Sequence, residues 1–289
     1  MSTFLRFVIR WVSYPLVFGG AAAFMIWALY AGVPYWPTTP IAAAIGLLSI
    51  AGLERIQPFR EAWLEDHQDT ATDLLHMLVN LSVIQFTAEI LAKLGDAVPA
   101  SVRLFPIESP LWLQLLLVAA VLDLGLYAMH RISHRVQWLW RFHMIHHSAE
   151  RLYWVNGERR HPLHAALMAG PGLVILLALG APSAVVATWF GILTVHLAFQ
   201  HSNLDYRLGW LRHLIGVAEI HRWHHKRDFE DAQVNFGEFL MVWDRLFGTF
   251  FDSAGKLGEA EVGLHEKDYP KGYLGQFAEP FGLDRRSKG

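Results

Sequence analysis

The sequence predicts an all-α, polytopic membrane protein: a core of about four main spanning helices plus hairpins, capped by a cytosolic histidine-rich helical region. Three observations carry this prediction. Hydrophobic residues make up 53% of the 289 residues and charged residues 17%, against about 45–50% and about 25% in soluble proteins. Several apolar runs approach the roughly 20 residues that a bilayer-crossing helix needs. The chain also has 16 histidines, most of them between His130 and His225.

The overall charge and the absence of cysteine exclude several classes of function. The formal net charge is −2, so no global basic field exists that could hold nucleic acid, and we expect no nucleic-acid partner. The chain has no cysteine, which excludes disulfides, zinc ribbons, iron–sulfur clusters and thiol catalysis. Histidine is therefore the residue type whose abundance needs an explanation.

The first two spanning helices are predicted to form a hairpin. Residues Tyr14–Val33 carry no charge over about the length of a spanning helix. A second apolar run, from Pro40 to about Ala51, follows the prolines of VPYWPTTP, which end one helix and begin the next. The stretch Glu54–Asp73 is too charged for lipid, and we expect it at the membrane surface.

The remaining spans lie in the middle of the chain. Helical patterning resumes over Leu74–Leu94, and the more apolar run Leu111–Met129 leads directly into the first histidine motif. Leu163–Phe199 is long enough for two helices, with a tight turn at Gly180–Pro182. After His201 the chain becomes polar, and we expect no further span.

Arginine distribution predicts the orientation, because short cytoplasmic loops carry an excess of Lys and Arg. Arginines gather before the first predicted span, after the second and after Met129, whereas the alternate loops are poor in them. Both termini and every histidine motif are therefore predicted to be cytoplasmic. The membrane would be the inner membrane in a bacterium and the endoplasmic reticulum in a eukaryote.

Three histidine motifs give the strongest functional signal. The first pairs His130 with His134, a spacing of four that places two imidazoles on one helical face. The second and third are both HxxHH, at residues 143–147 and 221–225, and the adjacent rings of each diverge enough to reach different metals. Eight imidazoles are too many for one ion and suit two. A single HxxxH is more often structural, but three such motifs on one predicted membrane face indicate metal binding.

This order of motifs, with a helical hairpin in the long gap before the last, resembles the fatty acid hydroxylase/sterol desaturase superfamily of membrane di-iron enzymes. The similarity extends to Arg160-His161-Pro162, Gln200-His201-Ser202-Asn203 and Trp243–Thr249. It implies two Fe ions as cofactors, for which Zn can substitute in a structure, O2 as the oxidant, and electrons from a separate donor such as cytochrome b5 or ferredoxin with its reductase. It also divides the chain into N-terminal membrane helices and a surface segment (1–110), a catalytic region (111–251) and a C-terminal cytosolic tail (252–289).

The resemblance assigns residues as well, and it suggests none that is catalytic beyond the metal ligands. The implied ligands are His130, His134, His143, His146, His147, His221, His224 and His225, with His201 as a ninth. His161, His164 and His196 are further candidates. His164 stands where many relatives have an acidic residue, and His196 is either a ligand or a satisfied helix residue. The other histidines, His67, His76, His213 and His265, are interpreted as structural.

Several polar residues are predicted to support the ligands or the substrate. Asp123 lies two helical turns before His130 on roughly the same face, within an apolar helix where an ionisable group is costly. It would accept a hydrogen bond from a ligand imidazole; the alternative is a pair with an arginine. Asn203 is predicted to play the same supporting role. Asn156, Arg159 and Arg160 would either orient a polar substrate head or form plain cytosolic surface.

Imidazole ligands alone do not select the metal, because they also suit zinc, copper and nickel. The sequence contains no HExxH, and Glu158-Arg-Arg-His161 is its only ExxH, which argues against a hydrolytic zinc site and against a soluble di-iron bundle. The resemblance thus implies O2-dependent hydroxylation or desaturation of a lipid, which could be a fatty acyl chain, a sterol or an ether lipid. Alkyl ether lipid monooxygenase and carotenoid hydroxylase are alternatives in the same superfamily. A metal transporter is the alternative from another class, although its ligands should lie near the bilayer midplane rather than beyond the helix ends.

Overall fold

The computed structural model describes residues 1–96, 99, 104–253, 255–266 and 268–282, without the side chains of 88, 89, 91–93 and 96. The described part is helical and has no strand, only isolated bridges such as Pro58 with Leu204. Its α-helices are α1 (Thr3–Tyr30), α2 (Tyr35–Ile56), α3 (Thr70–Asp96), α4 (Leu111–Arg135), α5 (Gln137–His147), α6 (Pro162–Leu179), α7 (Ser183–His201), α8 (Ala218–His221), α9 (Val242–Leu246) and α10 (Tyr273–Ala278). Short 3-10 helices include η1 (Glu61–Leu64), η3 (Trp154–Glu158), η4 (Gly209–His213), η5 (Arg222–His225), η6 (Glu259–Glu261) and η7 (Glu279–Phe281).

Five of the described helices are long and apolar enough to cross a membrane: α1, α2, α4, α6 and α7. They confirm the predicted all-α membrane core, with one more candidate span than the four main ones expected. The predicted turn at Gly180–Pro182 separates α6 from α7. The predicted span Leu74–Leu94 lies within α3, where several side chains are outside the described residues. After His201 the described helices are all short, as expected.

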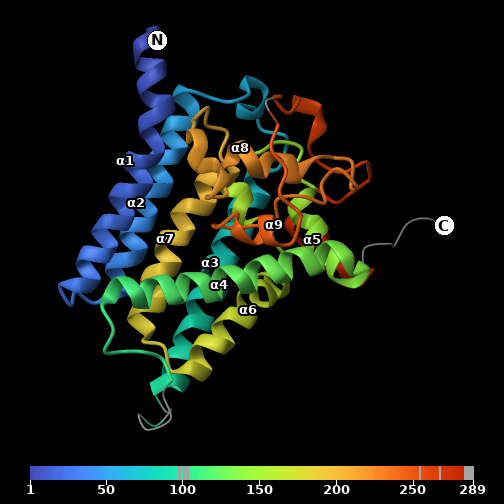
Figure 1. Ribbon diagram of the computed structural model, residues 1–289. Helices are drawn as coiled ribbons and strands as arrows, with labels where there is room; N and C mark the ends of the chain where they lie inside the picture. Colours follow the sequence, from blue (N-terminus) through green and yellow to red (C-terminus); the bar gives the residue numbers. More distant parts are fainter. Residues whose placement is uncertain (97–98, 100–103, 254, 267, 283–289) are drawn as a thin grey trace.

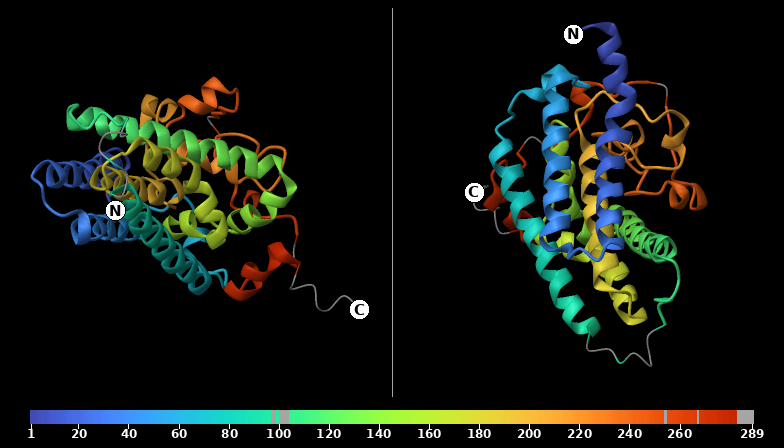
Figure 2. Two further views of the ribbon diagram at one scale, coloured as in Figure 1. Left: turned by 90° about the horizontal axis from the view of Figure 1, so that it is seen from below. Right: turned by 90° about the vertical axis from the view of Figure 1, so that its left-hand side faces the viewer.

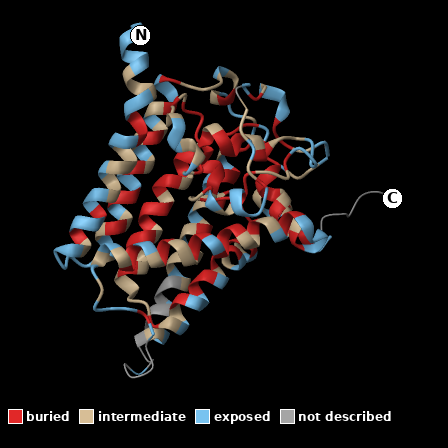
Figure 3. Ribbon diagram, in the orientation of Figure 1, coloured by how far each residue is buried: buried red, intermediate tan, exposed pale blue. Residues whose placement is uncertain are grey.

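The long helices form a bundle around one apolar core. Helices α1, α2 and α7 run side by side, α3 and α6 pack together, and α4 crosses the bundle at a steep angle (Figures 1 and 2). The core includes Met25, Ile50, Leu122, Val195 and other buried residues from these helices. Large apolar side chains such as Phe4, Phe7 and Trp27 remain exposed on α1, whereas buried residues gather on the inner faces (Figure 3). This is the pattern of a bundle whose outer surface contacts lipid.

Close backbone contact fixes the crossing of α4 and α6. Gly125 and Gly172 face each other there, and a Cβ added to Gly125 would lie 2.9 Å from the backbone nitrogen of Gly172. Small residues allow this approach, which is common between helices in membranes. The crossing sets the position of the C-terminal end of α4, which carries His130 and His134.

Residues 148–161 and 202–253, after α5 and α7, form a polar region. This region lies at the end of the bundle that also holds the N-terminus (Figure 1). Buried ion pairs attach it to the start of α3: Arg159 to Asp73, 2.6 Å between Nη1 and Oδ1, and Arg151 to Asp69, the residue before the helix, 2.8 Å. The carboxylate of Glu54, at the end of α2, accepts hydrogen bonds from the backbone N–H groups of Trp154 (2.8 Å) and Asn203 (2.6 Å). Buried charges with several partners are costly to separate, so these contacts hold the polar region rigidly against the helices.

Candidate metal centre

Nine buried histidines converge where the polar region meets the bundle. They form two groups, and within each group the candidate ligand atoms all lie within 4.8 Å of one another. The first group is His130, His134, His143, His147 and His224; the second is His146, His201, His221 and His225. These nine residues are the eight motif histidines and the predicted ninth, His201. The structure therefore brings together every residue of the main predicted ligand set.

His147 is the centre of the first group. Its Nε2 atom lies 3.1 Å from Nε2 of His134, 3.2 Å from that of His143 and 3.1 Å from that of His224. In the second group, Nε2 of His201 lies 3.2 Å from Nε2 of His146 and 3.1 Å from that of His221. Lone pairs of neutral imidazoles that point at one another repel unless a proton or a cation lies between them, so each group is a suitable site for a metal ion.

Adjacent histidines belong to different groups. His146 and His147 diverge at the end of α5, with an interplanar angle of 89°, and His224 and His225 diverge in η5, with 83°. Each HxxHH motif thus serves both groups, as its spacing predicts. The second HxxHH differs in one respect, since it runs through one turn of α8 and then η5 rather than along one α-helix. The rings of His147 and His225 stack with centroids 4.9 Å apart, which places the two groups side by side.

Backbone carbonyls orient three of the rings. The Nδ1 atoms of His130, His201 and His224 lie 2.9 Å from the carbonyl oxygens of Phe236, Leu197 and Val234, respectively. Each ring therefore donates Nδ1–H, and its Nε2 lone pair faces the centre. For His130 this Nε2 atom is buried and has no hydrogen-bond partner in the described part of the chain. A buried, unpaired acceptor held in this way fits a metal ion.

Burial keeps these rings in the form that binds metal. Burial, with smaller contributions from neighbouring histidines, holds the pKa of His143, His146, His147, His221 and His225 well below the usual value. Burial also lowers the pKa of His224 to about 4. Neutral imidazole is the ligating form, so the rings bind a cation without first losing a proton.

The three further candidates do not join either group. His161 caps α6 by accepting the N–H of Leu163 at 3.1 Å, and its ring stacks on Phe277. His164 lies beside His143, with ring centroids 4.9 Å apart, but its Nε2 atom contacts Ser133 Oγ at 2.9 Å.

His196 is a helix residue whose two ring nitrogens both have hydrogen-bond partners, and it belongs to neither histidine group. Its Nδ1 atom lies 2.8 Å from the hydroxyl of Tyr14, and its Nε2 atom lies 3.1 Å from the carbonyl of Gly216.

The supporting roles predicted for Asp123 and Asn203 are wrong. Asp123 accepts hydrogen bonds from the backbone N–H groups of Phe239 (2.8 Å) and Leu240 (2.9 Å) and from the indole of Trp243 (2.9 Å), and it pairs with no arginine that the structure describes. Two helical turns place it on the face of His130 but about 10 Å along the axis, beyond hydrogen-bond reach. Asn203 instead bonds the backbone of Arg60 through both ends of its amide.

Sequence reasoning missed two residues beside the ligands. Glu238 is fully buried, with a carboxylate oxygen 3.4 Å from Nδ1 of His130, and it also lies 3.4 Å from the guanidinium of Arg160. The side-chain amide of Gln233 lies 3.1 Å from Nδ1 of His134. Neither belongs to a motif, and only the loop geometry between η5 and α9 brings them to the centre. Asn156 and Arg159 bind the carboxylate of Asp73 and are structural. Of the three residues predicted to orient a substrate head, only Arg160 lies near the histidines, and its Nε atom has no hydrogen-bond partner in the described part of the chain.

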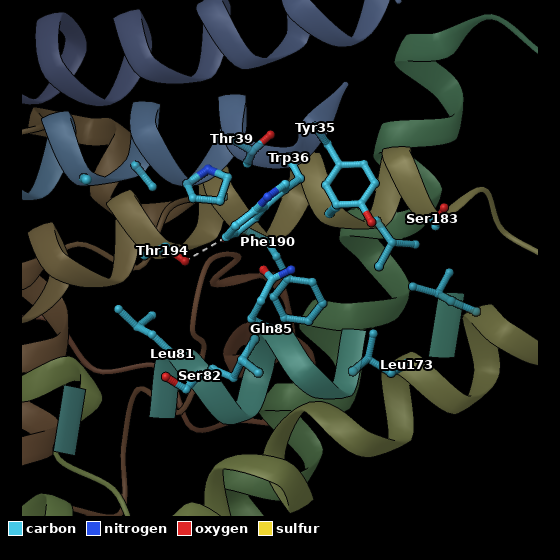
Figure 4. Close-up of a pocket in the computed structure, with 18 of the residues that line it drawn as sticks. Tyr35, Trp36, Thr39, Leu81, Ser82, Gln85, Leu173, Ser183, Phe190 and Thr194 are labelled. Carbon is cyan, nitrogen blue, oxygen red and sulfur yellow. Dashed lines mark hydrogen bonds between the residues drawn. The ribbon is translucent and has the colours of Figure 1, made fainter. Parts of the chain in front are cut away.

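An apolar cavity of about 430 Å³ opens between α2, α3, α6 and α7 (Figure 4). Its lining includes Trp36, Leu81, Leu173 and Phe190. A separate void of about 10 Å³ shares Leu47, Leu81 and Thr194 with its lining and borders Gly157 and Glu158. Gly157 packs on His201, since an added Cβ there would lie 3.1 Å from Nδ1 of that ring.

A separate cavity of about 390 Å³ borders His134 and His147, with Arg135, Trp140, Lys226 and Phe229 in its lining. The more polar cavity therefore borders two residues of the first group. None of the described residues that line the apolar cavity is a histidine.

Comparison with known proteins is consistent with this site. A family model described as fatty acid hydroxylase matches residues 115–249. The ornithine lipid hydroxylase OlsE of Rhizobium tropici is 32% identical over 252 residues, which cover 83% of this chain and 74% of that protein. The alkylglycerol monooxygenase of Danio rerio is 27% identical over 203 residues, covering 64% of this chain and 44% of that protein. A fatty acid hydroxylase of a Lecanicillium species, vlmA, is 32% identical over 150 residues, 46% of this chain and 40% of that protein. No solved structure matches.

Proposed function

This chain belongs to the fatty acid hydroxylase/sterol desaturase superfamily, and from that premise we propose that its nine clustered histidines hold two iron ions for the O2-dependent hydroxylation of a membrane lipid. Its relatives are named hydroxylases and monooxygenases of lipids, and the chain is an oxidoreductase of that kind. The observation that carries the proposal is the division of nine buried imidazoles into one group of five and one of four.

The donor set fits iron better than it fits a hydrolytic metal. Hydrolytic zinc sites use three protein ligands and an open position, whereas each group here offers at least four nitrogen donors. Two iron ions held by these groups would supply the oxidation of an unactivated C–H bond, with electrons from an external donor. The protein's own part is to keep the imidazoles neutral, to orient His130, His201 and His224 through backbone carbonyls, and to shield most of the imidazole surface from water by burial.

The apolar cavity in the bundle supports a lipid substrate. Its volume of about 430 Å³ falls within the range of about 300–1,000 Å³ typical of ligand pockets. We propose that a lipid tail enters it from the bilayer, with the head directed toward the histidine groups. Among lipids, an ornithine lipid is favoured, because the ornithine lipid hydroxylase aligns over most of both chains. An ether lipid is the second candidate, supported by the alkylglycerol monooxygenases over a shorter alignment.

The distribution of arginines and the second cavity support two further proposals, on membrane orientation and on the electron donor. We propose that the histidine groups and both termini face the cytoplasm, since arginines gather in the loops on that side. An electron-transfer protein would then approach the cavity bordered by His134 and His147, where Arg135 and Arg227 provide positive charge beside Glu266.

Lipid analysis under 18O2 tests the proposed function. Cells expressing the wild type should gain a lipid carrying one 18O atom, and the His147→Ala variant, which lacks the central ring of the first group, should not. Half-exposed His213→Ala, which lies outside both groups, is the matched control and should retain the product. A lipid that loses two hydrogens without label would indicate desaturation instead. Normal metal content without any lipid change, with a reducing partner supplied, would refute the assignment.

A further inference from the structure

A small cavity with a charged lining lies beside η5, and none of the nine clustered histidines lines it. Its volume is about 90 Å³, whereas a water molecule needs about 10–15 Å³, so the cavity has room for a group of several atoms. Of the described residues in its lining, four are cations and two are carboxylates: Arg207, Arg212, Arg222, Lys256, Glu219 and Asp252. The lining therefore has an excess of two positive charges.

Arg222 is a buried cation in this lining. It is only 4% exposed. Its Nη2 atom donates to the backbone carbonyls of Ser202 (2.7 Å) and Leu204 (3.0 Å), and its guanidinium stacks 3.9 Å from the centroid of the Phe59 ring. Its Nε atom is buried and has no hydrogen-bond partner within the described residues. A buried guanidinium with a free donor is costly unless an anion is close to it.

The two carboxylates of the cavity do not supply that anion, because each is paired with another arginine. Glu219 lies 2.9 Å from Nη1 of Arg207, and Asp252 lies 3.0 Å from Nε of Arg212. No carboxylate in the described part of the chain lies within ion-pair distance of Arg222. Its positive charge is therefore not compensated by the protein.

Lys256 is the second cation of the cavity without a carboxylate. Its ammonium group makes no hydrogen bond or ion pair within the described residues, and it lies 5.9 Å from the centroid of the same Phe59 ring on which Arg222 stacks. An arginine and a lysine beside one small space suit a phosphate group, which carries about one to two negative charges and several acceptor oxygens. The excess of positive charge argues against a metal ion here.

The cavity lies close to the N-terminal part of α1. The backbone N–H of Arg207 donates to the carbonyl of Arg10 at 2.8 Å. Gly209 packs on Trp11, since an added Cβ there would lie 3.4 Å from the indole ring. Trp11 and Phe7 are exposed on this part of α1, and exposed aromatic residues near the end of a spanning helix are typical of the headgroup level of a membrane. A phospholipid at that level would bring its phosphate to the cavity.

We infer that this cavity binds a phosphate group between Arg222 and Lys256, and that a membrane phospholipid supplies it. The site is distinct from the apolar cavity, with which it shares no lining residue, and it does not depend on the proposed oxidation. Arg222 lies between His221 and His224 in the chain. A phosphate held by its guanidinium therefore also steadies the segment that carries the last HxxHH motif.

Native mass spectrometry of the full, metal-loaded chain in an uncharged detergent tests the inference without turnover. The probes are phosphatidylglycerol and a diacylglycerol with the same tails but no phosphate. The wild type should bind phosphatidylglycerol about 10- to 100-fold more tightly, the range expected of hydrogen bonds to a charged group. Lys256→Gln should lower this ratio about tenfold. Lys271→Gln, which removes an exposed lysine outside the cavity, is the matched control and should leave the ratio unchanged.

Inorganic phosphate, titrated alone and followed by phosphorus NMR, separates the two sources of the group. Binding of phosphate without a preference for phosphatidylglycerol would keep the site and make soluble phosphate its ligand. Two results would overturn the inference. The first is equal binding of both lipids by the wild type together with no binding of phosphate, which decides the matter even if the variants do not fold. The second is a ratio that Lys256→Gln leaves unchanged or that Lys271→Gln lowers equally.

Discussion

Replacing two adjacent histidines one at a time should affect different metal sites. His224 is one of five candidate ligands in the first group, and His225 is one of four in the second. His224→Ala leaves the first group with four donors, still the number of a closed structural site, whereas His225→Ala leaves the second group with only three. Altering a residue that merely supports a ligand costs about 10- to 100-fold in metal affinity, or about 1.4–2.7 kcal/mol, and losing a ligand costs at least as much.

Metal analysis after dialysis against a chelator measures the difference. With the chelator set so that the wild type keeps both ions, His225→Ala should retain about one ion per chain and His224→Ala should retain more. Both variants remove the same side chain from the same 3-10 helix, so each serves as the control for the other. Equal losses from the two variants, or a greater loss from His224→Ala, would refute the argument that the five-histidine group tolerates the loss of one ligand better than the four-histidine group.

Three further predictions concern stability and acid. Asp123→Ala leaves three hydrogen-bond donors without their acceptor and should lower the free energy of unfolding by about 3 kcal/mol or more. The variant should therefore unfold at a lower temperature than the exposed control Leu124→Ala. Weakened metal binding at an unchanged unfolding temperature would argue against this structural role. Gly125→Val should destabilise the α4–α6 crossing by at least about 1–3 kcal/mol, and full stability in a thermal unfolding experiment would contradict the close contact. Burial lowers the pKa of His224 to about 4 in the folded chain. As the pH falls below about 6.5, the imidazole is therefore protonated in the unfolded chain before it is protonated in the folded chain. The metal-free protein should consequently lose stability between about pH 6.5 and pH 4. An unfolding temperature that stays constant over that range would exclude this effect.

The sequence predicted the spanning helices and the clustering of the nine histidines well, because both depend on local spacing. Apolar length alone identifies α1, α4 and the α6–α7 hairpin, and HxxHH placed on a helix separates His146 from His147 without further information. The ends of the helices were less accurate. Helix α1 begins at Thr3, well before the predicted start at Tyr14, since charged residues such as Arg6 interrupt an apolar run without ending a helix.

The errors concern groups whose partners are distant in the chain. Asp123 shares a helical face with His130, but its partners come from residues 239–243, which no local pattern connects to α4. Glu238 and Gln233 approach the ligands through the same loop and carry no motif. His196 was left open because a buried histidine can bind either a metal or a hydroxyl, and only the fold shows Tyr14 beside it.

The division of each HxxHH motif between two groups also constrains the assembly of the protein in the cell. The first group needs His130 from α4 and His224 from η5, and the second needs His201 from α7 and His225 from η5. Each proposed metal site therefore lacks part of its ligand set until the last HxxHH motif has been synthesised, which is after the whole of α4 and α7. Insertion must precede metal loading, so cells starved of iron should accumulate the inserted, metal-free protein, and iron added later should activate it without new protein synthesis.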